Sequence, residues 1–388
     1  MIGKSKIMTY KTLSALIAAT ILSSCTMIPD FGRPEFPAAQ NWNDVPGYEM
    51  PIGDTLATQM SWKEFFNSPE FHQIIDTALQ NNKDLKTAAL NISEARALYR
   101  IERADLFPNI NANGDATLSE SSDDSSVTGL AQTSELYQAN IGVAAYELDL
   151  FGRIRSNNES AINAYLATHE ARAVVENALI AETANSYLQL LADQKLLRLT
   201  QKTLDAQEHT YDILSRSLVK GVGTSQDLAR AETAVETARV NFHQYSRFVA
   251  QDKNALFLLM GIPHEEGFLP EITLDDLIIR DNLDPGLPSE VLLRRPDVRQ
   301  AEYELLSRNA DIGAARAAFF PSITLTGTYG FASQGLGELF TSGGAGAWTF
   351  FPQITLPIFQ GGRNRANLDL AEIRKEKAVV NYEQAIQI

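Results

Sequence analysis

ADLFPNI, at residues Ala104–Ile110, recurs in related form as AAFFPSI at Ala317–Ile323. About forty residues after each copy stands a second matching pair, LDLFGRIR at Leu148–Arg155 and LPIFQGGRNR at Leu356–Arg365. A helical pattern runs into each first motif and out of each second one. A repeat of about 210 residues is too long for a solenoid unit, whose period is roughly 20–50 residues. The chain is therefore expected to contain two related halves with two-fold pseudo-symmetry.

The composition indicates an ordered protein with an acidic surface. Of 388 residues, 44% are hydrophobic and 21% are charged, and the net charge of −15 gives a pI near 4.9. Such a balance argues against a nucleic-acid partner, because nucleic acids select basic surfaces. No apolar run approaches the roughly 20 residues that a membrane helix needs. One cysteine excludes an internal disulfide framework or a cysteine-based metal site.

The amino terminus has the pattern of a bacterial lipoprotein signal. Three lysines precede an apolar stretch at Leu13–Leu22, which is too short to span a membrane. Small residues then lead directly to Cys25. By resemblance to a lipobox, we expect residues 1–24 to be removed and Cys25 to be lipidated, with Thr26 favouring the outer membrane. The alternative is an ordinary signal peptide with an incidental cysteine.

Long helices dominate the pattern after residues 25–67, which are interpreted as an extended tether. Helical spacing is expected from Ser68 to about Leu106 and again from Asp297 to Phe320. Between Arg155 and Val219 there is no Gly or Pro, so that one helix would span roughly 100 Å. Glycines then break it, and a third helical run, Ser225–Met260, is expected to return antiparallel.

Four segments change to strict two-residue alternation. They begin near Ile110, Tyr137, Ser322 and Trp348, and each places apolar side chains opposite polar ones. Strands of about ten residues with this alternation are typical of a membrane β-barrel, although a half-exposed soluble sheet alternates in the same way. Four strands cannot close a barrel, so several chains would have to share one. Two chains would supply eight strands and three would supply twelve, and a conducting pore favours three.

In this order, the features resemble the TolC-like outer membrane efflux proteins, in their lipoprotein branch. Further motifs that carry the resemblance are RRPD at Arg294–Asp297, LFGR at Leu150–Arg153 and KGVGT at Lys220–Thr224. The resemblance implies a mainly α fold with a membrane β-barrel part. A homotrimer would combine twelve strands in an outer-membrane pore and twelve helices in a periplasmic tunnel. Its partners would be a periplasmic adaptor protein, an inner-membrane pump and outer-membrane lipid.

The same resemblance points to the helical tip as the functional site. Lys220, Gly221, Val222, Gly223 and Thr224 match the tip that meets the adaptor, although glycines there also serve a tight reversal. Asp227 matches an acidic ring at the periplasmic aperture, and three carboxylates would favour cations. Alternatively, Asp227 only complements the helix dipole.

No motif indicates catalysis. The five histidines form no His-x-x-x-His pair with an intervening glutamate, so the sequence lacks a zincin motif. The stretch Gly221–Ser225 resembles a phosphate loop faintly, but it lacks the lysine and follows a helix. We expect a protein that is not an enzyme and holds no metal or cofactor.

The repeat also predicts the domain organisation. After the signal peptide and tether, residues 68–260 form the first repeat, 261–297 an equatorial linker and 298–388 an incomplete second repeat. Against the first copy, the second lacks roughly 80 residues, including its own tip, and truncation at the carboxyl end is therefore expected. Two functions follow: a trimeric channel that exports drugs or other small molecules, or a non-conducting outer membrane lipoprotein with a structural or interaction role.

Overall fold

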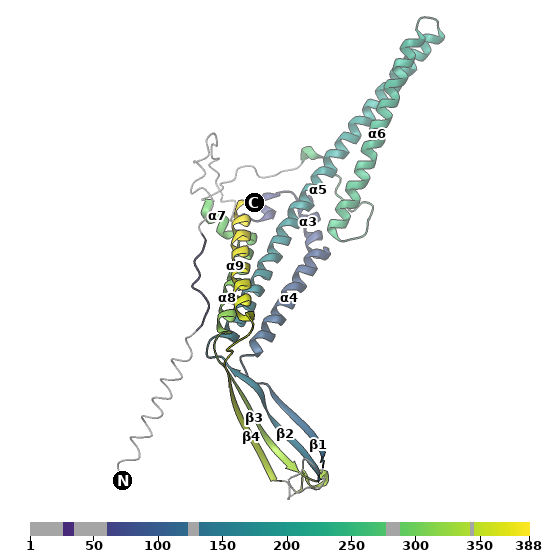
Figure 1. Ribbon diagram of the computed structural model, residues 1–388. Helices are drawn as coiled ribbons and strands as arrows, with labels where there is room; N and C mark the ends of the chain where they lie inside the picture. The colour runs from purple at the N-terminus through teal and green to yellow at the C-terminus, as the bar shows by residue number, and fades with distance from the viewer. Residues whose placement is uncertain (1–25, 35–59, 123–131, 277–287, 342–344) are drawn as a thin grey trace. The chain divides into compact units, whose positions relative to one another are not determined.

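The computed structural model describes residues 26–34, 60–122, 132–276, 288–341 and 345–388. Its fold is mainly helical with one four-stranded antiparallel sheet, as expected from the sequence (Figure 1). The chain forms two compact units. The first comprises Met1–Pro37, Ser93–Ala167 and Gln300–Ile388, and the second comprises Ala38–Ile92 and Thr168–Arg299. Within the described ranges, no helix combines the length and the apolar character needed to cross a membrane.

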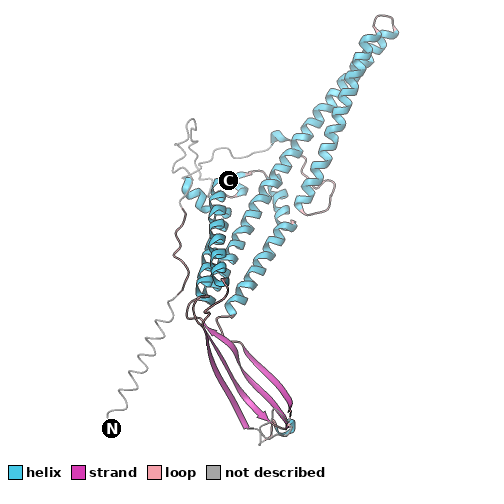
Figure 2. Ribbon diagram, viewed as in Figure 1, coloured by secondary structure: helices cyan, strands magenta, loops and turns pink. Residues whose placement is uncertain are grey.

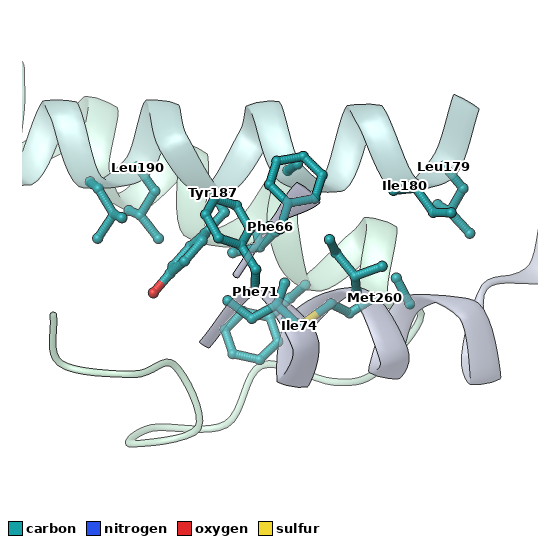
Figure 3. Packing of buried hydrophobic residues seen from close by; sticks show 14 of the residues in the cluster. Phe66, Phe71, Ile74, Leu179, Ile180, Tyr187, Leu190 and Met260 are labelled. Atoms are coloured by element: carbon teal, nitrogen blue, oxygen red, sulfur yellow. The ribbon is translucent and has the colours of Figure 1, made fainter. Parts of the chain in front are cut away.

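The second unit has a hydrophobic core between three helices. In α3 (Pro69–Asn81), Phe71, Ile74 and Ile75 recur at helical spacing and are fully buried. They pack against Tyr187 and Met260 of the two long helices, as Figure 3 shows. Full burial of such a side chain contributes roughly 1.5–3 kcal/mol. This core fixes α3 against the base of the helical hairpin.

The expected single helix from Ser68 to Leu106 is wrong, because α3 ends and α4 (Lys83–Ala104) begins on either side of Asn82. Asn82 has a non-helical backbone, and its Oδ1 accepts hydrogen bonds from the amides of Asp84 at 2.9 Å and Leu85 at 3.0 Å. Its Nδ2 donates to the carbonyl of Leu259 at 3.0 Å. The asparagine therefore caps α4 and ties the break to the end of α6.

The long hairpin is confirmed. Helix α5 spans Arg153–Val219, 67 residues, and α6 spans Ser225–Met260, 36 residues. Leu204 of α5 packs with Val235 and Ala238 of α6, so the two helices run side by side beyond the main core (Figure 1). Helix α6 is terminated by Gly261, the residue after Met260, which has φ of +67°. A Cβ there would lie 2.7 Å from the carbonyl oxygen of Asn81, so glycine is required on both grounds.

The first unit contains the sheet, drawn in magenta in Figure 2. Its strands are β1 (Ile110–Ser121), β2 (Gln132–Leu148), β3 (Ser322–Ser333) and β4 (Ala345–Thr355), in the order β1-β2-β3-β4. All neighbours are antiparallel, so the two repeats meet where β2 pairs with β3. In the sequence the alternation that begins near Trp348 continues to Ile358, but β4 ends at Thr355.

In this unit the end of α4 leads into β1 and the start of α5 follows β2, and the second repeat is connected in the same way. The second half of α8 (Pro296–Ala317) leads into β3, and α9 (Arg363–Gln387) follows β4. Residues 26–34, here called the strap, lie against α8. Asn309 donates to the carbonyl of Pro29 at 2.8 Å, and Arg33 forms an ion pair with Glu302. Two short helices complete the second unit, α2 (Trp62–Phe65) and α7 (Pro288–Arg294).

Candidate functional site

The tip of the hairpin is a tight reversal built from the last turn of α5. Gly221 has φ of +77°, a left-handed conformation that glycine adopts without strain. Gly223 is favoured for a different reason, since a Cβ would make a tight contact, 3.0 Å, with the amide nitrogen of Leu218. The amides of Val222 and Gly223 donate to the carbonyl of Ser217 at 3.0 and 3.2 Å. These bonds give the Ser217 carbonyl, in the last turn of α5, its hydrogen-bond partners and stabilise the shape of the loop.

Side chains at the tip face solvent. Val219 is 87% exposed, and Val222, between the two glycines, is 81% exposed. Lys220 is exposed as well. Exposed valines on a rigid turn present a small apolar surface, which is of the kind that marks protein contact sites. The structure therefore brings the five predicted contact residues together on one loop.

Thr224 and Asp227 cap the start of α6. The Thr224 hydroxyl oxygen accepts a hydrogen bond from the amide of Asp227 at 3.1 Å and donates to its carboxylate at 2.6 Å. Arg230 lies 3.9 Å from the same carboxylate. Asp227 is thus part of a helix cap and is also half exposed, so its capping role leaves it accessible to solvent.

The register of the sheet separates an apolar face from a polar one. One apolar row runs across all four strands, through Ala112, Ile141, Tyr329 and Trp348. Trp348 is 71% exposed and Ile141 is 54% exposed, so this face is uncovered in the single chain. An uncovered apolar sheet face of this kind requires lipid or another protein surface.

The polar face carries amides and hydroxyls. Asn113 donates to Asn140 at 3.4 Å across β1 and β2, and Thr328 bonds Thr349 at 2.7 Å across β3 and β4. Asp115 also belongs to this face and pairs in register with Gln138. The alternation expected for a membrane strand is therefore present in three dimensions on both sides of the sheet.

A β-bulge in β2 keeps the two faces consistent. The register shifts between Val143 and Tyr146, and Ala145 there has φ of +52°. The amide of Ala145 donates to the Thr326 hydroxyl at 3.2 Å. Val143 and Tyr146 are three positions apart, so regular alternation would place them on opposite faces. The extra residue of the bulge returns Tyr146 to the apolar face, a feature that the sequence analysis did not anticipate.

Ion pairs mark the junction of β2 and α5, where the LDLFGRIR motif lies. Glu147 pairs with Arg153, and Asp149 pairs with Arg155 at 3.1 Å. Asp149 also accepts from the amides of Ile154 at 3.2 Å and Arg155 at 2.9 Å, so it caps the start of α5. The motif therefore neutralises the carboxylates at this end of the strand.

Cys25 lies outside the described residues, although the strap begins next to it at Thr26. Ile28 lies so close to α8 that a Cβ on Gly313 would be 2.6 Å from its Cγ1 atom. Gly313 precedes the end of α8 by one turn, and the chain then enters β3. The strap contacts were not predicted from the sequence, because residues 26–34 carry no periodic pattern.

In the part of the chain that the structure describes, no group of three or more His, Cys, Asp or Glu side chains could hold a metal ion. Most of the polar side chains described above cap helices, bond across strands or neutralise one another. The site is therefore an arrangement of surfaces, comprising a helical tip and a two-faced sheet.

The chain combines a two-faced antiparallel sheet with a long helical hairpin, and it is built from a duplicated unit. This combination is typical of outer-membrane channel proteins that carry a long helical section. A family model described as "Outer membrane efflux protein" matches residues 74–262 and 287–388, and the chain belongs to this family.

Individual relatives agree with this assignment. The "Probable efflux pump outer membrane protein TtgC" of Pseudomonas putida is 46% identical over 98% of this chain and 78% of its own length. A crystal structure of a membrane protein from Pseudomonas aeruginosa has a TM-score of 0.86 at 39% identity, covering 94% of this chain and 80% of that chain. The open MtrE outer membrane channel of Neisseria gonorrhoeae has a TM-score of 0.81 at 40% identity, covering 94% and 79%.

Proposed function

We propose that this protein is the outer-membrane channel of an efflux system, exporting drugs or other small molecules. The observation that carries the proposal is the sheet, with one apolar face, one polar face, and β1 and β4 at its edges. Unpaired strand edges are not tolerated in lipid, since each unsatisfied backbone group raises the free energy by several kcal/mol. The sheet must therefore be completed by further strands.

Three copies of the chain best complete the sheet as a closed barrel. Two copies would supply eight strands, and the interior of an eight-stranded barrel is filled by side chains. Three copies supply twelve strands, with the polar faces lining a pore and the apolar faces in contact with lipid. The hairpins and shorter helices of the trimer then form the periplasmic tunnel.

The helical tip is the docking surface in this proposal. Lys220, Gly221, Val222, Gly223 and Thr224 meet a periplasmic adaptor protein, which links the channel to an inner-membrane pump. Three copies of Asp227 surround the aperture and favour cations. The rigid loop and its exposed valines support docking, because a fixed apolar turn loses little conformational entropy when it binds.

A lipid anchor at Cys25 fits the position of the strap. Cys25 is three residues from Ile28, and three extended residues span at most about 10 Å. Ile28 is held beside Gly313, close to where α8 leads into the sheet. Acyl chains on Cys25 would therefore be available to the membrane that surrounds the sheet. The channel needs no catalytic group or cofactor. Its two repeats are proposed to span residues 68–260 and 298–388, joined by the linker at 261–297.

Efflux of a fluorescent drug tests this function in a host that lacks its own channel and expresses the matching adaptor and pump. Val222→Asp should abolish efflux without unfolding the tip, since that side chain is exposed. Gly337→Asp is the matched control, because no atom of the described residues lies within 4 Å of a Cβ at that glycine. Unchanged efflux in the Val222 variant would contradict docking at the tip.

The assembly is tested separately on purified protein. Light scattering in detergent should give the mass of three chains, and planar bilayers should show conductance. A protein that reaches the outer membrane but never conducts would instead support the alternative function, a structural lipoprotein.

A further inference from the structure

The sequence around the strands contains acids and no bases. From Ala104 to Gly152 and from Ala317 to Gly362 there is no lysine, arginine or histidine. The carboxylates in these two segments are Asp105, Asp115, Glu120, Asp123, Asp124, Glu135, Glu147, Asp149 and Glu338. Any carboxylate that faces the interior of the barrel therefore lacks a basic neighbour on the strands themselves.

The register decides which strand carboxylates face that interior. Glu135 pairs with Leu118 and so belongs to the apolar face, near the end of β2 that is far from the helices. Asp115 and Glu147 belong to the polar face, because their register partners are Gln138 and Thr324. Glu120 shares the face of Leu118, two residues earlier in β1.

Of the two carboxylates on the polar face, one is neutralised. Glu147 is bound by Arg153, which enters from the first turn of α5. Asp115 lies in the middle of β1, and in the described part of the chain no ion pair is formed with it. Its surroundings are uncharged, with Gln138 opposite and the bonded amides of Asn113 and Asn140 one step along the same face. Asp115 is therefore the uncompensated charge of the polar face.

We propose that Asp115 determines the charge selectivity of the membrane section of the channel. This inference rests on the proposed trimeric channel, in which each chain contributes one Asp115 to the same level of the pore. Three carboxylates without counter-ions give that level a negative potential, which favours cationic solutes and retards anionic ones. The residue belongs to the sheet and is independent of Asp227 at the helical tip.

The local potential can be measured by the chemistry of a nearby thiol. Thr117→Cys places a thiol on the same face of β1, two residues from Asp115. The full chain is reconstituted in lipid vesicles and treated with a cationic or an anionic methanethiosulfonate of similar size at low ionic strength. Cys25 is the only native cysteine, so the chain without Thr117→Cys measures the background.

The ratio of the cationic to the anionic reaction rate should exceed that of a free thiol by about tenfold. A carboxylate several Å away attracts the cationic reagent and repels the anionic one, and in water the two effects together change the ratio by about this factor. Asp115→Asn should remove most of this excess, and about 1 M salt should do the same by screening. Glu135→Gln is the matched control and should leave the ratio unchanged, since it removes one charge from the opposite face.

Three results would overturn the inference. They are a ratio that Asp115→Asn leaves unaltered, a ratio that Glu135→Gln lowers equally, and a thiol introduced by Thr117→Cys that neither reagent reaches. Conductance separates this inference from the proposed function. A chain with the expected ratio but no conductance in bilayers would contradict the proposed channel, and with it a role of Asp115 in selectivity, while confirming the negative potential beside Asp115. In conducting protein, Asp115→Asn should move the reversal potential in a salt gradient towards zero.

Discussion

Glu147 at the end of β2 and Arg153 at the start of α5 form an ion pair with two hydrogen bonds. The Arg153 Nε atom donates to one carboxylate oxygen at 2.9 Å, and Nη2 donates to the other at 2.7 Å. A planar guanidinium matches a carboxylate in this way, which gives the contact a defined direction. The pair joins the strand to the helix and also cancels one charge on the polar face of the sheet.

Breaking this ion pair should loosen the junction of sheet and helix. Both side chains are partly exposed, so solvent screening limits the coupling energy to about 1 kcal/mol. We expect that value from a double-mutant cycle of Glu147→Gln and Arg153→Met, measured by thermal unfolding in detergent. The exposed pair Arg216 and Asp212 serves as the control and should show weaker coupling. Equal coupling for the two pairs would contradict a special role for the junction.

The bulge in β2 predicts an unusual tolerance to deletion. Removing Ala145 leaves one residue, Ala144, between Val143 and Tyr146, so regular alternation then keeps both on the apolar face. We expect this deletion to preserve insertion into the outer membrane. Removing Ala139, in the regular part of β2, should abolish insertion because one half of the strand would change faces. Western blotting of outer-membrane fractions compares the two, and equal loss in both would argue against the assigned register.

The contact of the strap with α8 predicts a specific effect at Gly313. A Cβ there would lie 2.6 Å from both Ile28 Cγ1 and Ser156 Oγ, so Gly313→Ala should displace the strap. Overpacking of this kind destabilises by typically 1–3 kcal/mol. Limited proteolysis should then cut within residues 26–34 at much lower protease concentration than in the unaltered chain. Gly337→Ala, whose Cβ meets nothing within 4 Å in the part of the chain that the structure describes, should leave the cleavage pattern unchanged.

The break between α3 and α4 depends on one side chain. Asn82→Ala removes a helix cap, worth about 1 kcal/mol, and leaves the carbonyl of Leu259 without its donor, worth about 1–3 kcal/mol more. Asn82→Asp keeps the cap but loses the donor, so its effect on the free energy of unfolding should be smaller than that of alanine. Denaturant unfolding measures both, and a neutral alanine variant would refute this role of Asn82.

The facing carboxylates of Asp193 in α5 and Asp252 in α6 predict a dependence on pH. Burial, followed by a hydrogen bond to Asp193 and repulsion by its charge, raises the pKa of Asp252 to about 6. Because the folded state holds this proton more tightly than the unfolded chain, its contribution to stability is present at low pH. The contribution is lost as the pH rises from about 4 through about 6.

Asp252→Asn should therefore stabilise the protein above pH 6 and flatten the stability profile below it. We expect a gain of at most about 1 kcal/mol at pH 8, because solvent screens a partly exposed group. Asp205→Asn on the exposed side of α5 is the control and should show no such gain. Thermal unfolding between pH 4 and 8 measures the effect, and a lower melting temperature for Asp252→Asn at pH 8 would contradict it.

The helical and strand segments were largely predictable because their signals are local. The absence of Gly and Pro from Arg155 to Val219 predicts α5 within two residues, and two-residue alternation predicts the four strands. Gly221 and Gly223 also mark the tip correctly as a reversal. Asn82 was missed because a cap between two apolar helical patterns does not interrupt their period.

The sequence by itself determined the duplicated architecture, the long hairpin and the two-faced character of the strands, since each depends on periods and motifs within neighbouring residues. Only the tertiary structure decided the phase of β2 around Ala145, the attachment of the strap at Gly313, and which carboxylate Arg153 neutralises. Those features depend on register and on distances between segments, in two cases far apart in the chain. Local periodicity carries no information about either, because it describes the faces of one element and not the partner each face meets.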